Sequence, residues 1–232
     1  MPQSAQYRTI IEIINNCFRR LGLDPVSAID STRMSNMALG LVNDVLDDLA
    51  GYGDWQEAYR EVVVTCAASV NRYKVAAVSA TTESVKNILG VYFGNQTVPL
   101  NPVTLMEIVQ FTRATAHGTP RHFCIQGVSG ADPLIRVYPT PATTATGPFS
   151  FMAHYYAKHR VLVTADASVV PMYNAKLVEQ GLYVKLLLEE AAGEPNPIVQ
   201  INLAEYEQKK KEEMNRFTYD TGDDHMQFYI GH

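Results

Sequence analysis

The chain has 232 residues, 47% of them hydrophobic, with a formal net charge of -5 and a pI near 5.7. This length and hydrophobic content supply enough material for a packed core in one domain or two small ones. The acidic balance argues against a protein that grips nucleic acid along a broad basic surface, because phosphate contacts need clustered Lys and Arg.

Neither secretion nor membrane insertion is indicated by the sequence. The first residues lack a basic run followed by an apolar core, so no signal peptide is expected. No segment approaches the ~20 apolar residues that a membrane-spanning helix needs. The three cysteines, Cys17, Cys66 and Cys124, lie far apart without a CxxC spacing. This pattern predicts reduced, buried thiols rather than a disulfide framework.

The first 56 residues predict two amphipathic helices. Over residues 4–22 the apolar residues recur at the spacing of one helical face, namely Tyr7, Ile10, Ile11, Ile14, Cys17, Phe18 and Leu21. Gly22 is the expected stop. A second helix is expected from residue 30 or 31 to about residue 49, with an apolar face of Met34, Met37, Leu41, Val45 and Leu49. Asp44, Asp47 and Asp48 are expected to form its solvated face.

Residues 57–165 have a different character and predict β structure. Runs of β-branched and aromatic residues separated by turn-formers predict strands at residues 60–66, 69–75, 84–93, 97–100, 121–126, 134–138 and 149–156. A short helix is expected at residues 102–113. The last three strands should form a β-meander. Within the run at 134–138, Ile135 and Val137 should point to the opposite face from their neighbours, because side chains alternate across a strand.

The C-terminal part predicts two further helices. The first should begin at residue 168 or 171 and end at about residue 193, before Pro195 and Pro197. The second should span residues 197–217, with one side formed by Val199, Leu203, Tyr206, Lys210, Met214 and Phe217. Its charged run at 209–213 is most simply a solvated face. The tail ends in MQFYIGH and is expected to be disordered or to lie on a neighbouring protein.

These elements predict an α+β fold with three parts. Residues 1–56 and 166–217 should form a discontinuous four-helix bundle, because two short antiparallel helices cannot bury both faces alone. Residues 57–165 should form an inserted antiparallel β-sandwich-like domain. Residues 218–232 should form a C-terminal extended arm.

No catalytic, metal or cofactor site is predicted. The sequence has no P-loop, GxSxG, HExxH, EF-hand loop or dinucleotide-binding glycine fingerprint. Ser129 lacks the preceding buried strand and following helix of a nucleophile turn. The possible ligands in and near the strands match no known metal-ligand spacing, these being His117, His122, His154, His159, Cys124 and Asp166. A structural or binding role is therefore favoured over catalysis.

Several stretches resemble a known family when taken in order. They are RRLGL at 19–23, LVNDVLDDLAGYGDW at 41–55, GTPRHFCIQG at 118–127, LIRVYPTP at 134–141, FMAHYYAKHRVL at 151–162, PMYNAKLVEQGLYVKLL at 171–187 and AEYEQKKKEEMNRF at 204–217. This layout resembles the head-to-tail adaptor proteins of tailed bacteriophages, and most closely the tail tubular protein A type of short-tailed phages. The resemblance covers about residues 7–217, and the tail beyond has no counterpart.

The resemblance implies a virion protein at the head-tail junction, made in the cytoplasm of the bacterial host, with no chemistry of its own. It implies a ring, usually of twelve copies, between the portal protein and the tail nozzle or tube, with tail fibres as a further possible partner. Double-stranded DNA would pass through the lumen without sequence-specific binding. Partner contacts are expected at Lys209, Lys210, Lys211, Arg216, Phe217, Tyr219, Phe228, Tyr229 and Ile230.

Two other function classes stay open on the sequence alone. A carbohydrate- or receptor-binding β module could stack Tyr92, Tyr155 and Tyr156 on sugars, although alternating tyrosines commonly pack across strands. An unrecognised hydrolase could instead be built around His122, His154 or Asp166.

Overall fold

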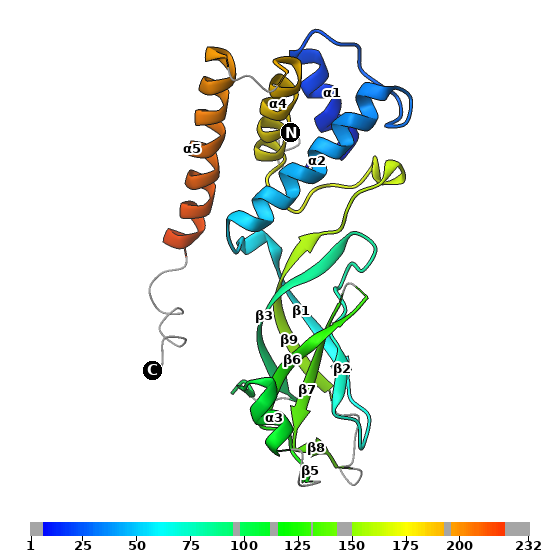
Figure 1. Cartoon of the computed structure of the whole chain (residues 1–232), viewed down its shortest axis with the longest axis vertical. Coiled ribbons are helices and arrows are strands. Elements are labelled where there is room, and N and C mark those ends of the chain that lie inside the picture. The colour runs from blue at the N-terminus through cyan, green and yellow to red at the C-terminus, as the bar shows by residue number, and fades with distance from the viewer. Residues whose placement is uncertain are drawn as a thin grey trace. The chain divides into compact units, whose positions relative to one another are not determined.

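The computed structural model of the protein describes residues 7–94, 98–111, 116–130, 132–142, 150–192 and 196–220, with the backbone alone for residues 216–220. These residues form five α-helices and several small sheets, which confirms the predicted α+β class. The chain divides into two compact units (Figure 1). One contains Met1–Glu57 with Val161–His232, and the other contains Ala58–Arg160.

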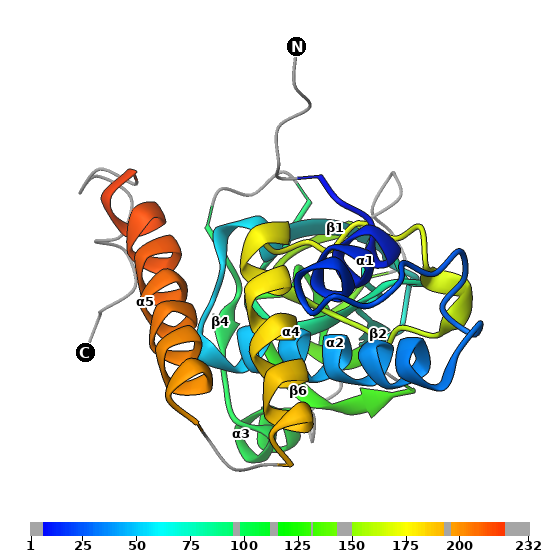
Figure 2. The same ribbon diagram turned by 90° about the horizontal axis from the view of Figure 1, so that it is seen from above.

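The helical unit is built around α4. Its elements are α1 (Ile10–Arg20), α2 (Arg33–Tyr52), the 3-10 turn η2 (Thr164–Asp166), α4 (Ala175–Glu190) and α5 (Pro197–Asp220). Helix α4 lies between α1 and α5 and also packs on α2 (Figures 1 and 2). Buried apolar side chains from all four helices form the core, among them Ile10, Ile14, Phe18, Val42, Val45, Leu49, Val178, Leu182 and Val199.

Helix α1 begins later than predicted, at Ile10. The Glu12 carboxylate accepts hydrogen bonds from the backbone N–H and the hydroxyl of Thr9, at 2.8 and 3.0 Å. Thr9 is therefore the capping residue, and the helix begins directly after it. The N–H of Ile10 donates to the Val169 carbonyl at 2.9 Å, so a distant segment completes the helix end. Tyr7, predicted on the apolar face, precedes the helix and is 76% exposed.

The buried face of α2 is rotated from the predicted one. Thr32 caps the helix by accepting from the Ser35 N–H at 3.0 Å, so α2 starts after the predicted residue and runs on to Tyr52. Met34 is 41% exposed, and the core contacts come instead from Ala38, Leu39, Val42, Val45, Leu46 and Leu49. Val45 of this face approaches α4 at Gly181, which has no side chain.

The two C-terminal helices also start at asparagine caps. The Asn174 side chain accepts from the Lys176 N–H at 3.0 Å, so α4 begins several residues after the predicted start. The Asn196 side chain accepts from the Val199 N–H at 3.0 Å. Helix α5 therefore begins at the predicted residue, Pro197, and it continues three residues past the predicted end at 217, to Asp220.

The described residues of the β unit form three sheets. Their orders are β1-β9-β3, β2-β7-β6-β4 and β5-β8. The strands are β1 (Tyr59–Thr65), β2 (Arg72–Lys74), β3 (Glu83–Phe93), β4 (Asn101–Pro102), β5 (His117–Gly118), β6 (His122–Ser129), β7 (Asp132–Tyr138), β8 (Thr140–Pro141) and β9 (Ser150–His159). All strand pairs are antiparallel except β4 with β6 and β5 with β8, which are parallel. The short helix α3 (Leu105–Phe111) lies within the predicted range.

The predicted meander is wrong in its third strand. Strands β6 and β7 pair as expected, but β9 lies in the other sheet, between β1 and β3. There it pairs on both sides, from Tyr156 to Ser150 along β1 and from His159 to Phe151 along β3, where two register shifts in β3 interrupt the ladder. A central position satisfies more backbone groups than the edge of a meander would.

The apolar faces of the strands form the core of the β unit. Ile135 and Val137 are fully buried, which confirms the predicted alternation in β7. In β9 the buried side chains are Phe151, Ala153, Tyr155, Ala157 and His159. Tyr73 of β2 packs edge-on against Phe151 at 5.1 Å between ring centroids, so the core lies where strands of two sheets meet. The predicted strand at 97–100 is not formed at residues 98–100.

The contact of α4 with α2 and α5 generates a prediction at Gly181. A Cβ there would lie 2.8 Å from a Val45 methyl and 3.0 Å from the Tyr206 ring. Overpacking costs roughly 1–3 kcal/mol, more than the gain of about 1 kcal/mol in helix propensity. Gly181→Ala should therefore lower the free energy of unfolding, measured by denaturant titration.

The matched control is Gly40→Ala in α2. Gly40 is exposed, and a Cβ there would meet nothing within 4 Å. This change should raise the free energy of unfolding by about 0.5–1 kcal/mol. Equal effects of the two substitutions would show that close helix packing at Gly181 does not limit stability.

Candidate functional site

The candidate catalytic and metal-binding residues are dispersed. His122 lies in β6 with its ring 5.4 Å from that of Phe111, whereas His154 and His159 lie on opposite faces of β9. Asp166 belongs to the helical unit and accepts the Val163 N–H at 2.8 Å. Among the residues that the structure describes, no group of three His, Cys, Asp or Glu side chains could hold a metal ion.

Burial suppresses the reactivity of the thiols. Cys17 and Cys124 are buried and Cys66 is half-buried, and none forms a disulfide. Burial, followed by the nearby Glu179 carboxylate, raises the pKa of Cys17 to about 12. Burial likewise raises the pKa of Cys66 to about 12. A thiol with such a pKa is almost entirely protonated near neutral pH and is a poor nucleophile.

An aromatic cluster occupies the outer face of the β1-β9-β3 sheet. The Tyr59 hydroxyl bonds His154 Nδ1 and donates to Glu61 at 2.9 Å. The rings of Tyr92 and Tyr156 pack against this pair at 4.7 Å from His154 and 6.3 Å from Tyr59. Burial, followed by the hydrogen bond to Glu61, raises the pKa of Tyr59. The members are already paired with one another across strands.

Tyr155 cannot serve in a sugar-binding platform. It is fully buried on the opposite face of β9, and its hydroxyl oxygen accepts the Val78 N–H at 2.8 Å. Of the three tyrosines considered for stacking on sugars, only Tyr92 and Tyr156 reach the outer face of the sheet. Their packing against His154 and Tyr59 is the cross-strand arrangement that alternating tyrosines commonly adopt.

The structure separates the predicted partner-binding residues into three groups. Lys209 and Lys211 are exposed on α5, whereas Lys210 is 3% exposed. Arg216, Phe217 and Tyr219 lie in the last turns of α5, where only the backbone is described. Phe228, Tyr229 and Ile230 lie outside the described residues.

Lys210 joins α5 to α2 from inside the protein. Its ammonium donates to the Asp48 carboxylate at 3.1 Å and to Glu207 at 2.9 Å. It also lies over the rings of Tyr52 and Tyr206, at 4.6 and 5.0 Å from their centroids. Its charge is thus balanced by groups of its own chain, and we leave Lys210 out of the proposed partner contacts.

The electrostatics of this cluster follow from the same contacts. Burial lowers the pKa of Lys210, but the hydrogen bonds to Glu207 and Asp48 outweigh it and hold the pKa above its ordinary value. Burial raises the pKa of Tyr206, and the Asp48 carboxylate that accepts from its hydroxyl at 2.9 Å raises it further. Asp48 was predicted to be merely solvated, but it is the acceptor that links α2 to α5.

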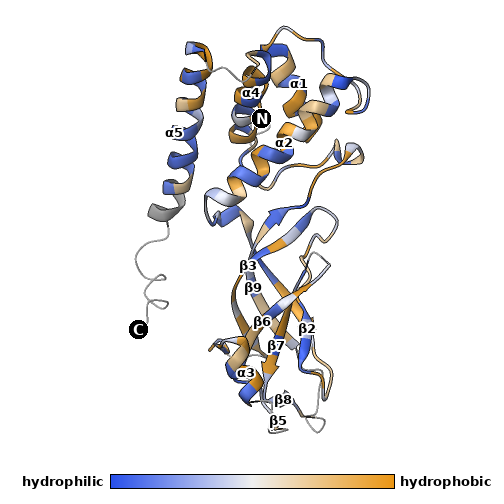
Figure 3. Cartoon of the chain, in the orientation of Figure 1, coloured by the Kyte–Doolittle hydropathy of each residue, from blue (hydrophilic) through white to orange (hydrophobic). Residues whose placement is uncertain are grey.

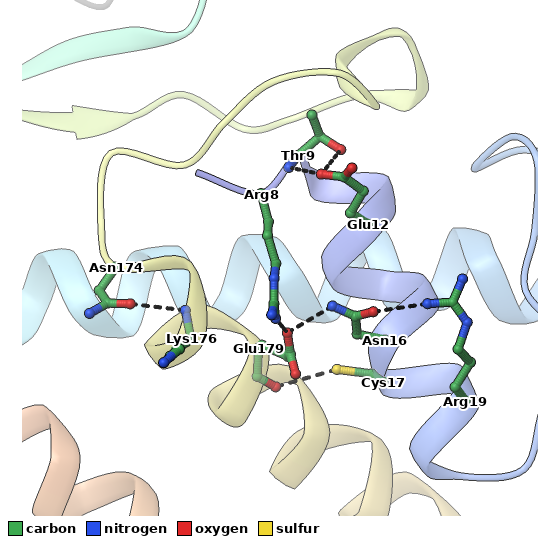
Figure 4. A network of polar contacts seen from close by, with 9 residues as sticks. All are labelled: Arg8, Thr9, Glu12, Asn16, Cys17, Arg19, Asn174, Lys176 and Glu179. Carbon is green, nitrogen blue, oxygen red and sulfur yellow. Dashed lines mark hydrogen bonds and ion pairs between the residues drawn. The ribbon is translucent and has the colours of Figure 1, made fainter. Parts of the chain in front are cut away.

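A second polar network joins α1 to α4 (Figure 4). The Glu179 carboxylate accepts from the Arg8 guanidinium and from the Asn16 amide, the latter at 3.1 Å. The Cys17 thiol donates to the Glu179 carbonyl at 3.3 Å. Sequence reasoning missed this network, because Asn16 and Glu179 are 163 positions apart and neither has a local spacing signal.

The described surface has two shallow grooves with polar linings. One, of about 350 Å³, is lined by Asn174, Lys176, Leu177, Lys209, Glu212 and Glu213. The other, of about 420 Å³, is lined by Gly118, Thr119, Arg121, His122, Tyr138 and Pro139. Neither combines a nucleophile, a base and an orienting group in the way that a hydrolytic site needs. The described helices include none that is both long and apolar enough to cross a membrane.

The chain matches a known protein family over most of its length. The family model described as SU10 adaptor protein matches residues 8–228 of the chain. Because the match covers almost the whole chain, it identifies the class of the protein as a bacteriophage head-to-tail adaptor, a structural component of the virion. The chain belongs to the SU10 adaptor protein family. The predicted adaptor class is thereby confirmed, but the match extends to residue 228, beyond the predicted end of the resemblance at residue 217. No individual curated protein matches the chain significantly.

Lys210 and Lys211 are neighbours with opposite environments, which allows a matched test. Lys210→Ala removes hydrogen bonds to two carboxylates, and such bonds contribute roughly 1.5–3 kcal/mol each. Asp48 and Glu207 are 43% and 50% exposed, so water compensates in part and a loss of about 2 kcal/mol is expected. Lys211→Ala should change the free energy of unfolding by less than about 0.5 kcal/mol. Chemical denaturation of both variants is the measurement, and equal values would contradict the assigned role.

Proposed function

We propose that this adaptor joins the portal protein to the tail nozzle or tube and forms part of the conduit for the genome, as in the tail tubular protein A type of short-tailed phages. The four helices act as one bundle that builds a closed ring of about twelve copies. The β unit acts as a sandwich-like domain that meets tail proteins or fibres. The family match over residues 8–228 carries this proposal.

The organisation of the chain supports a division of labour between the two units. Both ends of the chain contribute to the helical unit, and residues 58–160 form a unit with its own sheets. An inserted unit with its own core can change its surface residues without disturbing the helices that would build the ring. Separate units suit a protein that meets one set of partners on each.

The charge of the chain suits a conduit. A formal net charge of -5 per copy would be multiplied in a ring. An acidic lumen repels phosphate and lets double-stranded DNA pass without being trapped. No base-reading or phosphate-gripping surface is needed for that task.

The C-terminal arm is the second part of the proposal. We place the contacts with portal and tail proteins at Lys209, Lys211, Arg216, Phe217, Tyr219, Phe228, Tyr229 and Ile230. Aromatic residues at the end of an extended segment are effective anchors, because they bury a large area in a partner.

Deletion of the gene from a phage that carries it tests the central proposal. Particles made without the chain should have assembled heads and portals but no attached tail, and they should fail to retain DNA. Electron microscopy and a nuclease-protection assay are the measurements, with the gene supplied in trans as the control. Tailed, DNA-filled particles that fail only to adsorb would favour a receptor-binding role instead.

A triple variant, Phe228→Ala, Tyr229→Ala and Ile230→Ala, tests the arm. Each aromatic anchor of an interface contributes roughly 2 kcal/mol or more, so incorporation into particles should fall while the thermal stability of the purified chain stays unchanged. Copies per particle are measured by quantitative mass spectrometry. The matched control replaces the polar neighbours His225 and Gln227 by Ala and should assemble normally. Normal incorporation of the triple variant would remove the arm from the contact set.

A further inference from the structure

One side of α5 is an uncovered ridge. Five residues at helical spacing, and therefore on one side of the helix, are all exposed, namely Ile198, Ile201, Glu205, Gln208 and Glu212. The two isoleucines are 60% and 61% exposed. Figure 3 shows the hydrophobic start of α5 and its mostly hydrophilic remainder. We call these five residues the α5 ridge.

The apolar end of the ridge lies away from the contacts that hold α5 to its own chain, whereas Glu205 accepts a hydrogen bond from the Gln180 amide of α4 at 3.4 Å and Glu212 lines the groove beside the start of α4. Among the α5 side chains that the structure describes, Val199, Tyr206 and Lys210 form a narrow buried strip, and by helical spacing Ile201 lies on the side opposite to it. Two isoleucines exposed together on one turn are an unfavourable feature of an isolated subunit. Burying both side chains in a neighbouring protein would remove apolar surface from water, which is favourable.

A second exposed surface lies where α1 ends and α2 begins. Leu23 follows the end of α1 and is 38% exposed, and Met34 in the first turn of α2 is 41% exposed. Arg19 and Arg33, near them in the sequence, are exposed as well. Arg33 occupies the first turn of α2, where the positive end of the helix dipole disfavours a cation. Local electrostatics therefore does not account for its presence. We call this surface the α1-α2 corner.

The corner is held in a fixed shape by hydrogen bonds. The Asn15 amide bonds both the carbonyl and the N–H of Val26, at 2.9 and 2.8 Å. The Ser35 hydroxyl donates to the Ile29 carbonyl, and Ile29 is 1% exposed. A loop fixed in this way loses little further freedom on binding, which favours a stable contact.

The two surfaces complement each other in charge. Glu205 and Glu212 make the ridge negative. The corner has three arginines, and although Asp24 and Asp30 lie in the same connection, its balance stays positive. One of the three, Arg20, is stacked on the Tyr183 ring at 3.7 Å. Each surface therefore pairs exposed apolar side chains with the charge that the other lacks.

Their positions suit a head-to-tail contact. In Figures 1 and 2 helix α5 lies on one side of α4, and the corner lies on the other. Two different surfaces on opposite sides of a subunit give a heterologous contact between copies, and such contacts close into a ring when the rotation between neighbours allows it. A two-fold dimer would require each surface to complement itself, which like charges oppose.

We propose that the α5 ridge of one copy packs against the α1-α2 corner of the next copy. This contact rests on the proposed ring and specifies which surfaces build it. The occupant of the ridge is thus a second copy of this chain, and Ile201 and Leu23 lie at the centre of the contact.

Disulfide trapping in phage particles tests the contact. A phage is complemented with a chain carrying both Ile201→Cys and Leu23→Cys, and purified particles are oxidised and run on a non-reducing gel. The expected result is a ladder from dimer upward, because each copy links to the next on both sides. Each single variant and the natural chain, whose cysteines are buried or half-buried, should stay monomeric. The matched control pairs Ile201→Cys with Met106→Cys, at a 73% exposed position of α3.

The outcomes separate this contact from the proposed function. Crosslinked dimers from Ile201→Cys alone would show that ridges face each other across a two-fold axis, which would overturn the head-to-tail contact. Particles that contain the double variant and assemble tails, but give no ladder, would overturn the contact and leave the adaptor function intact. Particles that never contain the chain would overturn the proposed function itself.

Discussion

The helical unit depends on how closely its helices approach α4. At Gly181 the α4 backbone lies so near to Val45 of α2 and Tyr206 of α5 that a Cβ would be within 3.0 Å of both side chains. Interiors are packed at crystal density and do not yield easily to an added atom. The central helix thus positions the helices from both ends of the chain, and the two ends form one unit although residues 58–160 separate them in the sequence.

Helix α5 is attached differently from the other helices. Its buried strip is narrow and includes a lysine whose ammonium is balanced by Asp48 and Glu207. Only the ammonium is buried, since Asp48 and Glu207 are 43% and 50% exposed. A buried cation without a partner is strongly unfavourable, so this position of α5 requires the carboxylate of Asp48 on α2 beside it.

The structure of this adaptor family member offers surfaces for protein contacts rather than a pocket for chemistry. The described part of the chain has no cluster of metal ligands, and its histidines are dispersed over separate strands and faces. It has instead two sets of exposed side chains, the α5 ridge and the α1-α2 corner, and a half-buried aromatic cluster around His154. In a structural virion protein, function depends on surfaces of this kind, because assembly is a sequence of specific surface contacts.

The sequence by itself determined the class of fold and the approximate positions of the four long helices and most strands, because helical and strand periodicities are local properties. The adaptor family followed separately, from the resemblance of several stretches to known head-to-tail adaptors. It predicted the start of α5 at Pro197 and the inward side chains of β7 correctly. Only the tertiary structure decided the start of α1, which is completed by the carbonyl of Val169, and the place of β9 between β1 and β3. It also decided that Lys210 is buried while Lys209 and Lys211 are exposed. Each of these outcomes depends on partners far away along the chain, and no spacing within a short segment records them.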